Sequence, residues 1–591
     1  MTFEKLSFYI QKIENTSSRL EMTEYLSELF KKASGDEIGN ICYLLLGRVA
    51  PLFDGVEFGM ADKFMIRAIA ISLGIDQPRV LKEFKKKGDM GIVVESLKSQ
   101  NLNSNKSAFV LRQAQELRRG KQNSKRNTNV NEVFDELYEI AKISGFGSQD
   151  KKITRMAEII NSVSPLSARY LVRIPLDKLR LGFSDMTILD SLSWMITGDK
   201  SLRVKLEVAY SVRPDIGFIA SQVKKDGIES LSGVKAKLGV PILASLCQRI
   251  PTADEMIKKM VRVAVEPKFD GVRVQIHFKK VHSSQFIVHS FSRNLENTTG
   301  MFPELDEISK QVEASEVILD SEAVGIDPKT GKIIPFQETA TRKRKHNIDL
   351  FTTSVPIKFF VFDILYVDGK DLISKPLEDR RDILEKTIKK GKILEMSPQI
   401  ITDKPNKLRK YHEDQIKKGL EGVVVKKWTS PYTPGRRNYS WVKFKEEGRV
   451  GKLTDTIDGV VMGYYLGEGK RSGFGIGALL VGIRNEDNIV TVSKIGTGVS
   501  DNMWKDFKIK LEKLKARSKP KIYEQVQKTL VPDVWCEPKM VIEVAGDDLT
   551  KSQVHGSGVA IRFPRLVRIR TDKSLQQITS TEEIKKMYKM Q

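Results

Sequence analysis

The sequence predicts a multidomain protein with an all-α N-terminal domain, an α+β middle domain and a small C-terminal β-barrel. Its 591 residues are enough for about three to five domains of ordinary size. In roughly the first 200 residues, apolar side chains recur at spacings of three and four, which is typical of amphipathic helices. Farther along, short β-like runs divided by glycine turns replace this pattern. We therefore divide the chain into residues 1–232, 233–447 and 448–591.

The N-terminal domain contains two clearly periodic segments and one segment without a period. Met60 to Leu73 and Met186 to Ile196 place apolar residues at helical spacing, so both are predicted to be helices. Between Ser99 and Asn131 the sequence is rich in Asn, Ser, Gln and basic residues, which predicts an exposed loop or hinge. A solvated linker explains this segment best, although its basic residues could touch phosphate: Arg118, Arg119, Lys121, Lys125 and Arg126.

The middle and C-terminal domains are predicted from short apolar runs. The middle domain has the runs RVAV, VRVQIHF, FIVHSF, EVILDSEAVGI, IKFFVFDILYV and GVVVKKW, with a helical stretch over Leu377 to Lys389. This mixture predicts an α+β domain. The C-terminal domain has the runs IDGVVMGYYL, ALLVGIR, NIVTVSKI, MVIEVAG and LVRIRT, with one amphipathic helix, DNMWKDFKIKLEKL. Short strands between glycine-rich turns suit an OB-fold, a barrel that accommodates nucleic acid.

The charge balance favours a polyanionic partner. The chain carries 99 Lys and Arg against 75 Asp and Glu, so its formal net charge is +24 and its pI is near 9.5. Nucleic acid is the first candidate partner for such a surface, and an anionic membrane is the second. No run approaches the roughly 18 apolar residues of a membrane span, and the first residues lack a signal peptide, so we expect an intracellular protein.

Cysteine and histidine usage excludes several kinds of site. The three cysteines are widely separated and form no CxxC pair, which excludes a disulfide framework and a structural zinc module. The six histidines show no HExxH motif or other ligand spacing. Any metal chemistry is therefore expected to use carboxylates and a hard cation.

The sharpest local motif runs from Glu266 to Arg273 and reads EPKFDGVR. Its lysine, Lys268, lies beside an apolar strand run, and the turn at Asp270 and Gly271 would fix the direction of the side chain. Such a lysine can act as an amine nucleophile. A hairpin with ordinary charged edges explains the motif equally well when it is taken alone.

Further motifs follow in a fixed order, and together they indicate a family. In chain order, the motif residues are Ser292, Arg293 and Asn294 in SFSRNLEN, Asp320 and Glu322 in ILDSEAVG, Phe362 and Asp363 in FFVFDILYVDG, Glu421 and Lys426 in EGVVVK, and Lys443 and Lys445 in WVKFK. With KxDGxR at its head, this series resembles the nucleotidyltransferase superfamily of ATP-dependent DNA ligases and capping guanylyltransferases. Longer stretches such as PFQETATRKRK, YTPGRRNYSWVKFK, IRFPRLVRIRTDK, GFGSQDKKI and LRLGFSD resemble replicative DNA ligases of the archaeal and eukaryotic type. The resemblance spans essentially the whole chain.

The resemblance implies an ATP-dependent DNA ligase that seals nicks between a 5′-phosphate and a 3′-hydroxyl in duplex DNA, in replication, repair and recombination. Lys268 would carry AMP as a covalent lysyl adduct and pass it to the DNA as a DNA-adenylate. Glu266 would accept from the adenine amino group, and Phe362 would stack on the purine. Arg273 and Arg293 would hold the ribose and phosphate. An aromatic residue in FFVFDILYV is by itself most often core, so only the motif order places Phe362 in the site.

Two glutamates are the predicted metal ligands. Glu322 and Glu421 lie on runs that are otherwise apolar, where an unpaired acid is unfavourable, and by resemblance they would bind Mg²⁺. Pairing with a lysine is the alternative, and Lys426 or Lys443 could serve. The family pattern also allows Glu322 to bind the ribose.

The remaining predicted contacts are cationic. Lys443 and Lys445 should share one strand face toward the α-phosphate, with Arg437 on the nucleotide's other flank. By resemblance, a basic cluster on the OB domain would orient pyrophosphate, although a general DNA-contact patch is the alternative: Arg562, Arg565, Arg568, Arg570 and Lys573. The change between these tasks implies a hinge near residues 445–452. The helical domain would grip the DNA backbone.

The expected partner is nicked duplex DNA, bound by a monomer without membrane attachment. The family implies a cytoplasmic location for the archaeal type and raises a sliding clamp as a partner, although residues 99–131 contain no clear clamp-binding peptide. Three alternatives stay open. A capping guanylyltransferase would not need the helical domain, and an NAD⁺-dependent ligase would resemble a four-cysteine zinc design that is absent here. A non-catalytic nucleic-acid-binding protein would have lost the charged motif residues.

Overall fold

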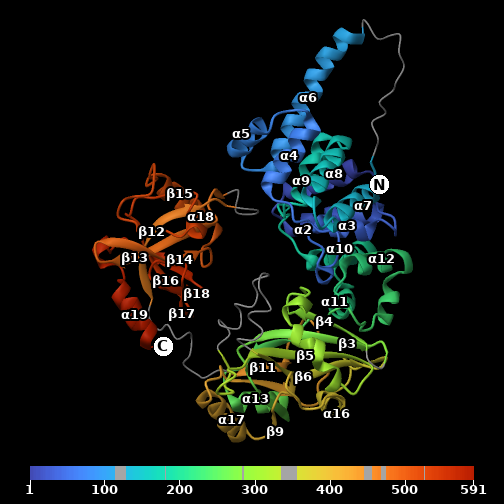
Figure 1. The fold of residues 1–591 in the computed structure, drawn as a ribbon, viewed down its shortest axis with the longest axis vertical. Helices are drawn as coiled ribbons and strands as arrows, with labels where there is room; N and C mark the ends of the chain where they lie inside the picture. The colour runs from blue at the N-terminus through green and yellow to red at the C-terminus, as the bar shows by residue number, and fades with distance from the viewer. Residues whose placement is uncertain are drawn as a thin grey trace. The chain divides into compact units, whose positions relative to one another are not determined.

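The fold is taken from a computed structural model of the chain (Figure 1). The structure describes residues 1–113, 128–179, 181–282, 285–334, 356–444, 456–467, 474–524 and 526–590, with the backbone alone for residues 102–113. The chain forms two compact units, Met1–Lys445 and Glu446–Gln591, and each unit is described by itself. None of the helices within these residues is long and apolar enough to span a membrane.

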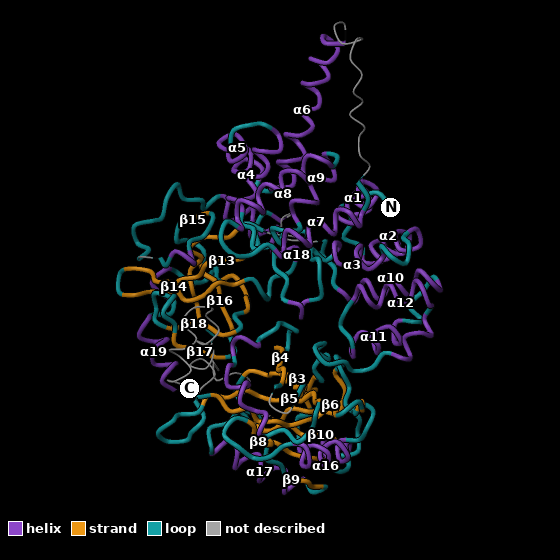
Figure 2. Tube along the Cα trace, turned by 45° about the vertical axis from the view of Figure 1, so that its right-hand side comes forward, coloured by secondary structure: helices purple, strands orange, loops and turns teal. Residues whose placement is uncertain are grey.

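Within the described residues, the regular structure of the N-terminal part of the first unit is helical (Figures 1 and 2). Its helices are α1 (Phe3–Glu14), α2 (Arg19–Lys32), α3 (Ile38–Leu45), α4 (Asp62–Leu73), α5 (Gln77–Lys87), α6 (Met90–Gln113), α7 (Val130–Lys142), α8 (Ser148–Ser162), α9 (Pro165–Arg173), α10 (Asp185–Thr197), α11 (Arg203–Val212) and α12 (Ile216–Asp226), with 3₁₀ turns η1 (Leu52–Asp54) and η2 (Ile228–Gly233). Helices α4 and α10 confirm the two helices predicted from apolar spacing. Side-chain caps fix several starts, such as the capping box of Asn129 and Glu132 on α7.

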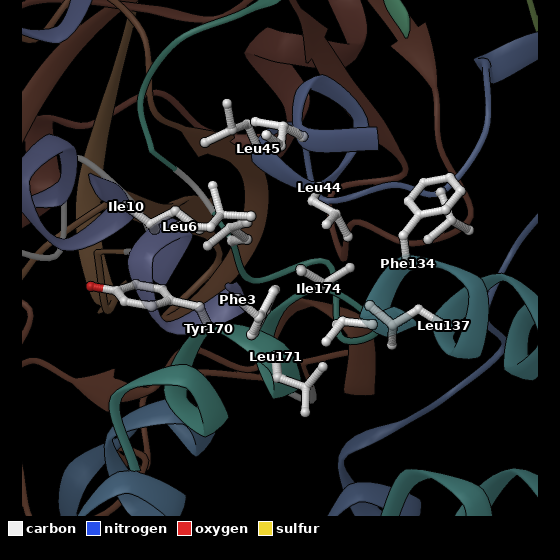
Figure 3. Close-up of a cluster of buried hydrophobic side chains, with 14 of the residues drawn as sticks. Phe3, Leu6, Ile10, Leu44, Leu45, Phe134, Leu137, Tyr170, Leu171 and Ile174 are labelled. Carbon is white, nitrogen blue, oxygen red and sulfur yellow. The ribbon is translucent and has the colours of Figure 1, made fainter. Parts of the chain in front are cut away.

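These helices share one apolar core. Leu6 and Ile10 of α1, Leu171 of α9 and Leu44 of α3 belong to one buried cluster, part of which Figure 3 shows. Helix α6 packs on α9, α2 on α10, and α4 on α8. Because Leu6, Leu44 and Leu171 are completely buried, truncating one of them to alanine would destabilise the unit by about 2–5 kcal/mol.

The loop predicted for Ser99 to Asn131 is wrong in its first half, since α6 continues to Gln113. The first two polar residues of this segment with described bonds donate to helix carbonyl oxygens. Ser99 Oγ donates to the carbonyl oxygen of Glu95 at 2.8 Å, and Asn101 Nδ2 donates to that of Leu73 at 2.9 Å. The five basic residues predicted as phosphate contacts, from Arg118 to Arg126, lie outside the described residues.

The rest of the first unit is built on two sheets. The first has the strand order β1-β11-β10-β2-β9, and the second has β4-β3-β5-β6-β7 with β8 on β6. The strands are β1 (Leu246–Arg249), β2 (Val263–Pro267), β3 (Val272–Lys280), β4 (Phe286–Ser292), β5 (Glu316–Gly325), β6 (Ile357–Val367), β7 (Lys370–Asp371), β8 (Leu394–Met396), β9 (Ile400–Thr402), β10 (Val423–Lys427) and β11 (Arg437–Phe444). All six strand runs predicted for the middle domain are confirmed.

Each sheet packs one apolar face on helices, and its other face carries polar side chains together with some buried apolar ones. Helices α13 (Ala253–Met260) and α17 (Pro405–Lys417) share a core with Val265 and Val425 of the first sheet. Helix α16 (Leu377–Thr387) and the 3₁₀ segments η3 (Thr299–Met301) and η4 (Pro303–Lys310) lie against the second, whose core includes Ile276. Strand alternation then turns Arg273 and Gln275 to the opposite face.

The second unit is rich in strands. A six-stranded sheet has the order β14-β13-β12-β16-β19 with β15 on β12, and β17 pairs with β18. Its elements are β12 (Ile457–Tyr465), β13 (Ala478–Asn485), β14 (Asn488–Ile495), α18 (Asp501–Glu512), η7 (Lys528–Leu530), β15 (Val534–Trp535), β16 (Val541–Ala545), β17 (Asp548–Lys551), β18 (Val559–Arg562), β19 (Arg565–Ile569), η8 (Leu575–Gln577) and α19 (Thr581–Met590). The helical, α+β and strand-rich parts of the predicted fold class are thus confirmed, whereas the predicted hinge lies outside the described residues.

Candidate active site

Lys268 follows directly after β2, in a short loop that is held between the two sheets of the first unit. Its backbone N–H donates to the carbonyl oxygen of Gly422 at 2.9 Å. The next residue, Phe269, stacks on Phe360 of β6 with ring centroids 4.2 Å apart. Gly271 passes so close to β5 that a Cβ atom there would lie 2.4 Å from the carbonyl oxygen of Ala323. The loop therefore gives the lysine a fixed position.

Two carboxylates, Glu421 and Glu322, lie beside the amine of Lys268. Glu421 forms an ion pair with Lys268 Nζ. Burial raises the pKa of Glu322 to about 7, although Arg273 and Lys268 act to lower it. Among the residues that the structure describes, Glu322 has no cation within ion-pair distance. A positive charge brought to this position would stabilise its ionised form.

Arg273 is fixed by a buried network. Its Nε and Nη2 donate to the two carboxylate oxygens of Asp320 at 3.0 and 2.6 Å, and its Nη1 donates to the carbonyl oxygen of Ser245 at 2.7 Å. Burial alone would lower the pKa of Arg273, but the facing Asp320 keeps this pKa well above its ordinary value. The guanidinium is therefore charged at any working pH and has one orientation.

Glu266 and Phe362 meet at Lys426. The Nζ atom of Lys426 donates to Glu266 Oε1 at 2.8 Å and to the carbonyl oxygen of Phe362 at 3.2 Å. It also lies 4.5 Å from the centroid of the Phe362 ring and 4.3 Å from that of Trp441. Lys426 was one alternative partner for the two predicted metal ligands, Glu322 and Glu421. In the structure it pairs with Glu266 instead. The Phe362 ring is partly exposed and has its edge contact with Trp441.

The structure brings most other predicted contacts to the same place. Arg293 lines a small hollow together with Arg273 and Asp320. Lys443 lies on β11 opposite Val424 of β10, and Lys445 lies outside the described residues. Burial raises the pKa of Cys247, and four nearby cations act against this rise: Arg273, Lys426, Lys443 and Lys268. These four cations therefore lie close enough to Cys247 to act on its thiol.

Arg437 is less closely tied to this group. It is the first residue of β11 and pairs in register with Leu246 of β1. Leu246 follows Ser245, whose carbonyl oxygen accepts a hydrogen bond from Arg273. Its side chain is exposed and forms no ion pair with a described residue. The structure thus places Arg437 at the edge of the site, where a ligand could still reach it.

Comparison with known proteins identifies the family. The model described as ATP dependent DNA ligase domain matches residues 241–445, DNA ligase N terminus matches residues 2–193, and ATP dependent DNA ligase C terminal region matches residues 472–573. A protein of Dictyoglomus thermophilum named probable DNA ligase is 41% identical over 100% of this chain and 98% of its own length. The chain belongs to the ATP-dependent DNA ligase family. A DNA ligase of Acidianus ambivalens is 36% identical, again over 100% of this chain and 98% of that protein.

Membership of the ligase family makes this chain an enzyme that uses ATP and has DNA as its substrate. The fold agrees over nearly the full length with a solved structure named Pmar-Lig_PreS3. That structure is 17% identical, has a TM-score of 0.51, and the match covers 96% of this chain and 99% of the other.

In the C-terminal unit of this ligase, most residues of the predicted basic cluster face carboxylates. Arg568 Nε donates to Glu543 Oε2 at 2.6 Å, and Arg570 Nη1 donates to Asp458 Oδ1 at 3.1 Å. Lys573 also pairs with Asp458, Arg570 pairs with Asp572, and Arg565 pairs with Asp547. Among the described residues, Arg562 is the one member of the cluster without an ion pair. The cluster is thus largely neutralised within its own unit.

Sequence reasoning missed two residues of the ligase site, Tyr432 and Trp441. Tyr432 lies in the stretch YTPG, which indicates a turn and gives no sign that its ring is buried. Trp441 lies two residues before Lys443 in WVKFK, so the period of two could have placed it on the lysine face. In the structure, Trp441 contacts Phe362, Tyr432 and Lys426.

Proposed function

We propose that this ligase seals nicks between a 5′-phosphate and a 3′-hydroxyl in duplex DNA, through a covalent AMP adduct on Lys268. One observation carries the proposal. Lys268 is held rigidly between the two sheets, with Glu421 against its amine and Arg273 and Glu322 beside it. A fixed nucleophile with a proton acceptor in contact is the arrangement that nucleophilic catalysis requires.

The first step forms the adduct. Glu421 is placed to take a proton from the ammonium of Lys268, and the free amine then attacks the α-phosphorus of ATP. A nitrogen–phosphorus bond forms, the bond from the α-phosphorus to the bridging oxygen breaks, and pyrophosphate leaves. Phe362 offers a partly exposed ring for the purine, while Arg273, Arg293 and Lys443 lie where they can stabilise phosphate charge.

The next two steps use the DNA. The 5′-phosphate of the nick attacks the adduct, so that the nitrogen–phosphorus bond breaks and a phosphoanhydride joins AMP to the DNA. The 3′-hydroxyl then loses its proton and attacks the activated 5′-phosphate, forming the phosphodiester bond and releasing AMP. The proposal places these reactions in replication, repair and recombination.

We propose Mg²⁺ as the cofactor, held by Glu322 and Glu421. Within the described residues, no group of three or more Asp, Glu, His or Cys side chains could hold a metal ion. Two carboxylates beside a phosphate site nevertheless fit Mg²⁺, which keeps several waters and takes phosphate oxygens as ligands. The desolvated carboxyl of Glu322 would gain a counter-charge. When bound, the ion supplies charge neutralisation at the phosphates.

The proposal is tested with α-³²P-labelled ATP. We expect the wild type to acquire a covalent label that survives denaturing gel electrophoresis in the presence of Mg²⁺, and to lose this reaction with EDTA. Lys268→Ala should acquire no label and should not seal a nicked duplex. Lys279→Ala is the matched control, because Lys279 lies on β3, the next strand along the chain, and pairs with Glu316 outside the site. An unlabelled wild type, or a labelled Lys268→Ala, would contradict the mechanism.

DNA binding gives a second test. A net charge of +24 on a protein that contacts phosphates should release counterions, so affinity for nicked duplex should fall steeply as salt rises. Neutralising about six phosphates would give a slope of log K against log salt near −5. Binding that is independent of salt between 50 and 200 mM would contradict backbone contacts.

The proposal includes three properties that rest on family resemblance alone: a monomeric state, a cytoplasmic location and a sliding clamp as a partner. Light scattering on the pure protein should give a mass near 66.9 kDa for a monomer. Cell fractionation tests the location. Stimulation of sealing by a purified sliding clamp tests the partner.

A further inference from the structure

We infer that Tyr432 is a positioning residue for nucleotide binding and acts through Arg273. The inference deepens the proposed function and rests on it, because Arg273 is one of the residues expected to hold the nucleotide. Tyr432 lies in the loop between β10 and β11, and its side chain is only 2% exposed. Such burial requires that its hydroxyl be satisfied by protein groups.

The hydroxyl of Tyr432 joins three separate segments. It accepts hydrogen bonds from the backbone N–H of Ser245 at 3.0 Å and from Arg273 Nη2 at 3.1 Å. It donates to Asp320 Oδ2 at 2.7 Å. One donor and two acceptor positions are all that a hydroxyl offers, so every one is used. Burial and Asp320 hold the pKa of Tyr432 well above its ordinary value, and the group therefore stays a donor.

This network determines how the Arg273 guanidinium points. Asp320 and the carbonyl oxygen of Ser245 are its other two acceptors. The same phenol donates to Asp320 and accepts from the backbone N–H of Ser245, so it is bonded to both residues. Removing the hydroxyl would leave the Ser245 N–H without this partner and would free the Asp320 carboxylate to rotate. Arg273 would keep its charge but lose its single orientation.

The ring of Tyr432 has a separate role in packing. It meets Trp441 edge to face, with centroids 5.7 Å apart, and lies 5.8 Å from the guanidinium carbon of Arg380. These contacts belong to the ring and are independent of the hydroxyl. Tyr432→Phe therefore removes the hydrogen bonds while keeping the packing.

The chain offers a matched control in Tyr366. Its hydroxyl donates to the carboxylate of Glu316 at 2.9 Å, a bond of the same kind on the same sheet. Glu316 is the first residue of β5, six positions before Glu322, and this separation corresponds to roughly 20 Å along a strand. Tyr366→Phe thus removes a comparable bond away from the nucleotide group.

The test compares lysine adenylylation over a range of ATP concentrations. We expect Tyr432→Phe to raise the KM for ATP about five- to tenfold, with kcat changed less than about twofold, because it weakens a charge-assisted network. Tyr366→Phe should leave both constants unchanged. An unchanged KM in Tyr432→Phe, or the same increase in Tyr366→Phe, would overturn the inference.

Two further measurements separate positioning from general destabilisation. In proteins that also carry Lys268→Ala, which cannot form the adduct, we measure the Kd for ATP with and without Arg273→Lys. Tyr432→Phe should weaken ATP binding when Arg273 is present. When Arg273 is replaced by lysine, Tyr432→Phe should change the Kd by less than about twofold. Additive effects of the two substitutions would contradict action through Arg273.

If Tyr432→Phe does not fold, Asp320→Asn must produce the same rise in KM, and a normal KM in Asp320→Asn would also overturn the inference. A wild type that acquires no label would instead refute the proposed function.

Discussion

One ion pair beside the candidate site in the first unit and two ion pairs of the basic cluster in the second unit differ in their burial. In the first unit, Arg380 and Asp363 form a pair in which both side chains are 0% exposed. In the second unit, Arg565 and Asp547 are both 47% exposed, and Arg568 is 62% exposed beside Glu543. A buried pair cannot open without leaving a charge unsolvated, whereas an exposed pair exchanges with water at little cost.

This difference corresponds to two uses of positive charge. The buried pairs around Lys268 give fixed positions to groups that must meet the nucleotide in one geometry. The exposed arginines of the C-terminal unit can leave their carboxylates when a more highly charged phosphate is offered. Most cations of the cluster between Arg562 and Lys573 would then be paired with carboxylates while no polyphosphate is bound, and would contact the polyphosphate when it binds.

The largest predicted effect is at the buried pair. Asp363→Asn keeps the shape of the side chain but leaves Arg380 buried without its anion, since Arg380 Nε and Nη2 both donate to Asp363. We expect the free energy of unfolding to fall by about 3–5 kcal/mol. Urea denaturation followed by circular dichroism measures it. A loss below about 1 kcal/mol would remove the contrast between these pairs.

The next effect is a pH dependence at Glu322. Its pKa of about 7 in the folded protein lies above the ordinary value of 4.5, so folding favours the protonated carboxyl. The resulting stability is present below about pH 4.5 and is lost as pH rises through 7. Between pH 5 and 8, we expect the wild type to lose about 2 kcal/mol of unfolding free energy relative to Glu322→Gln. Parallel pH profiles for the two proteins, measured without divalent cations, would show that Glu322 is not desolvated.

A smaller effect is predicted at the exposed cation Arg568. Arg568→Gln should slow lysine adenylylation about tenfold, because one charge-assisted hydrogen bond to polyphosphate is lost. Its thermal unfolding temperature should stay within a few degrees of the wild type. Lys510→Gln is the control, since Lys510 forms an exposed pair with Asp506 on α18. Equal rates in Arg568→Gln and the wild type would assign the cluster a role other than nucleotide contact.

The smallest effect is predicted at Asp547. Asp547→Asn removes an exposed partner of Arg565 and should change the free energy of unfolding by less than about 1 kcal/mol. The same urea titration used for Asp363→Asn measures it, so the two variants can be compared directly. A loss as large as that of Asp363→Asn would mean that burial does not distinguish these pairs.

Most of the fold could be predicted because its elements carry clear local signals. The runs around Phe278, Leu319 and Val361 became β3, β5 and β6, because short runs rich in β-branched and aromatic residues are typical of buried strands. The continuation of α6 beyond Ser99 could not be predicted. Its polar residues are typical of loops, and only the bonds that Ser99 and Asn101 make to helix carbonyls show otherwise.

The sequence predicted which residues belong to the candidate site, but not which of them form ion pairs with one another. The motif order indicated Lys268, Glu266 and Glu421, yet any lysine there could in principle pair with any glutamate. The sheet decides this choice, because β2 and β10 place Glu266 opposite Val424 and bring Lys426 to Glu266. In the C-terminal unit, Asp458 and Arg570 lie 112 positions apart, and no local pattern links them.

The backbone amide proton of Lys268 can report on the opening of the site. It is hydrogen-bonded to the carbonyl oxygen of Gly422, and the residue that follows Lys268, Phe269, stacks on Phe360. It can exchange with deuterium only when the strands on both sides separate. The exchange rate at Lys268 should therefore follow the opening of the nucleotide site, and bound nucleotide should slow it in proportion to its affinity.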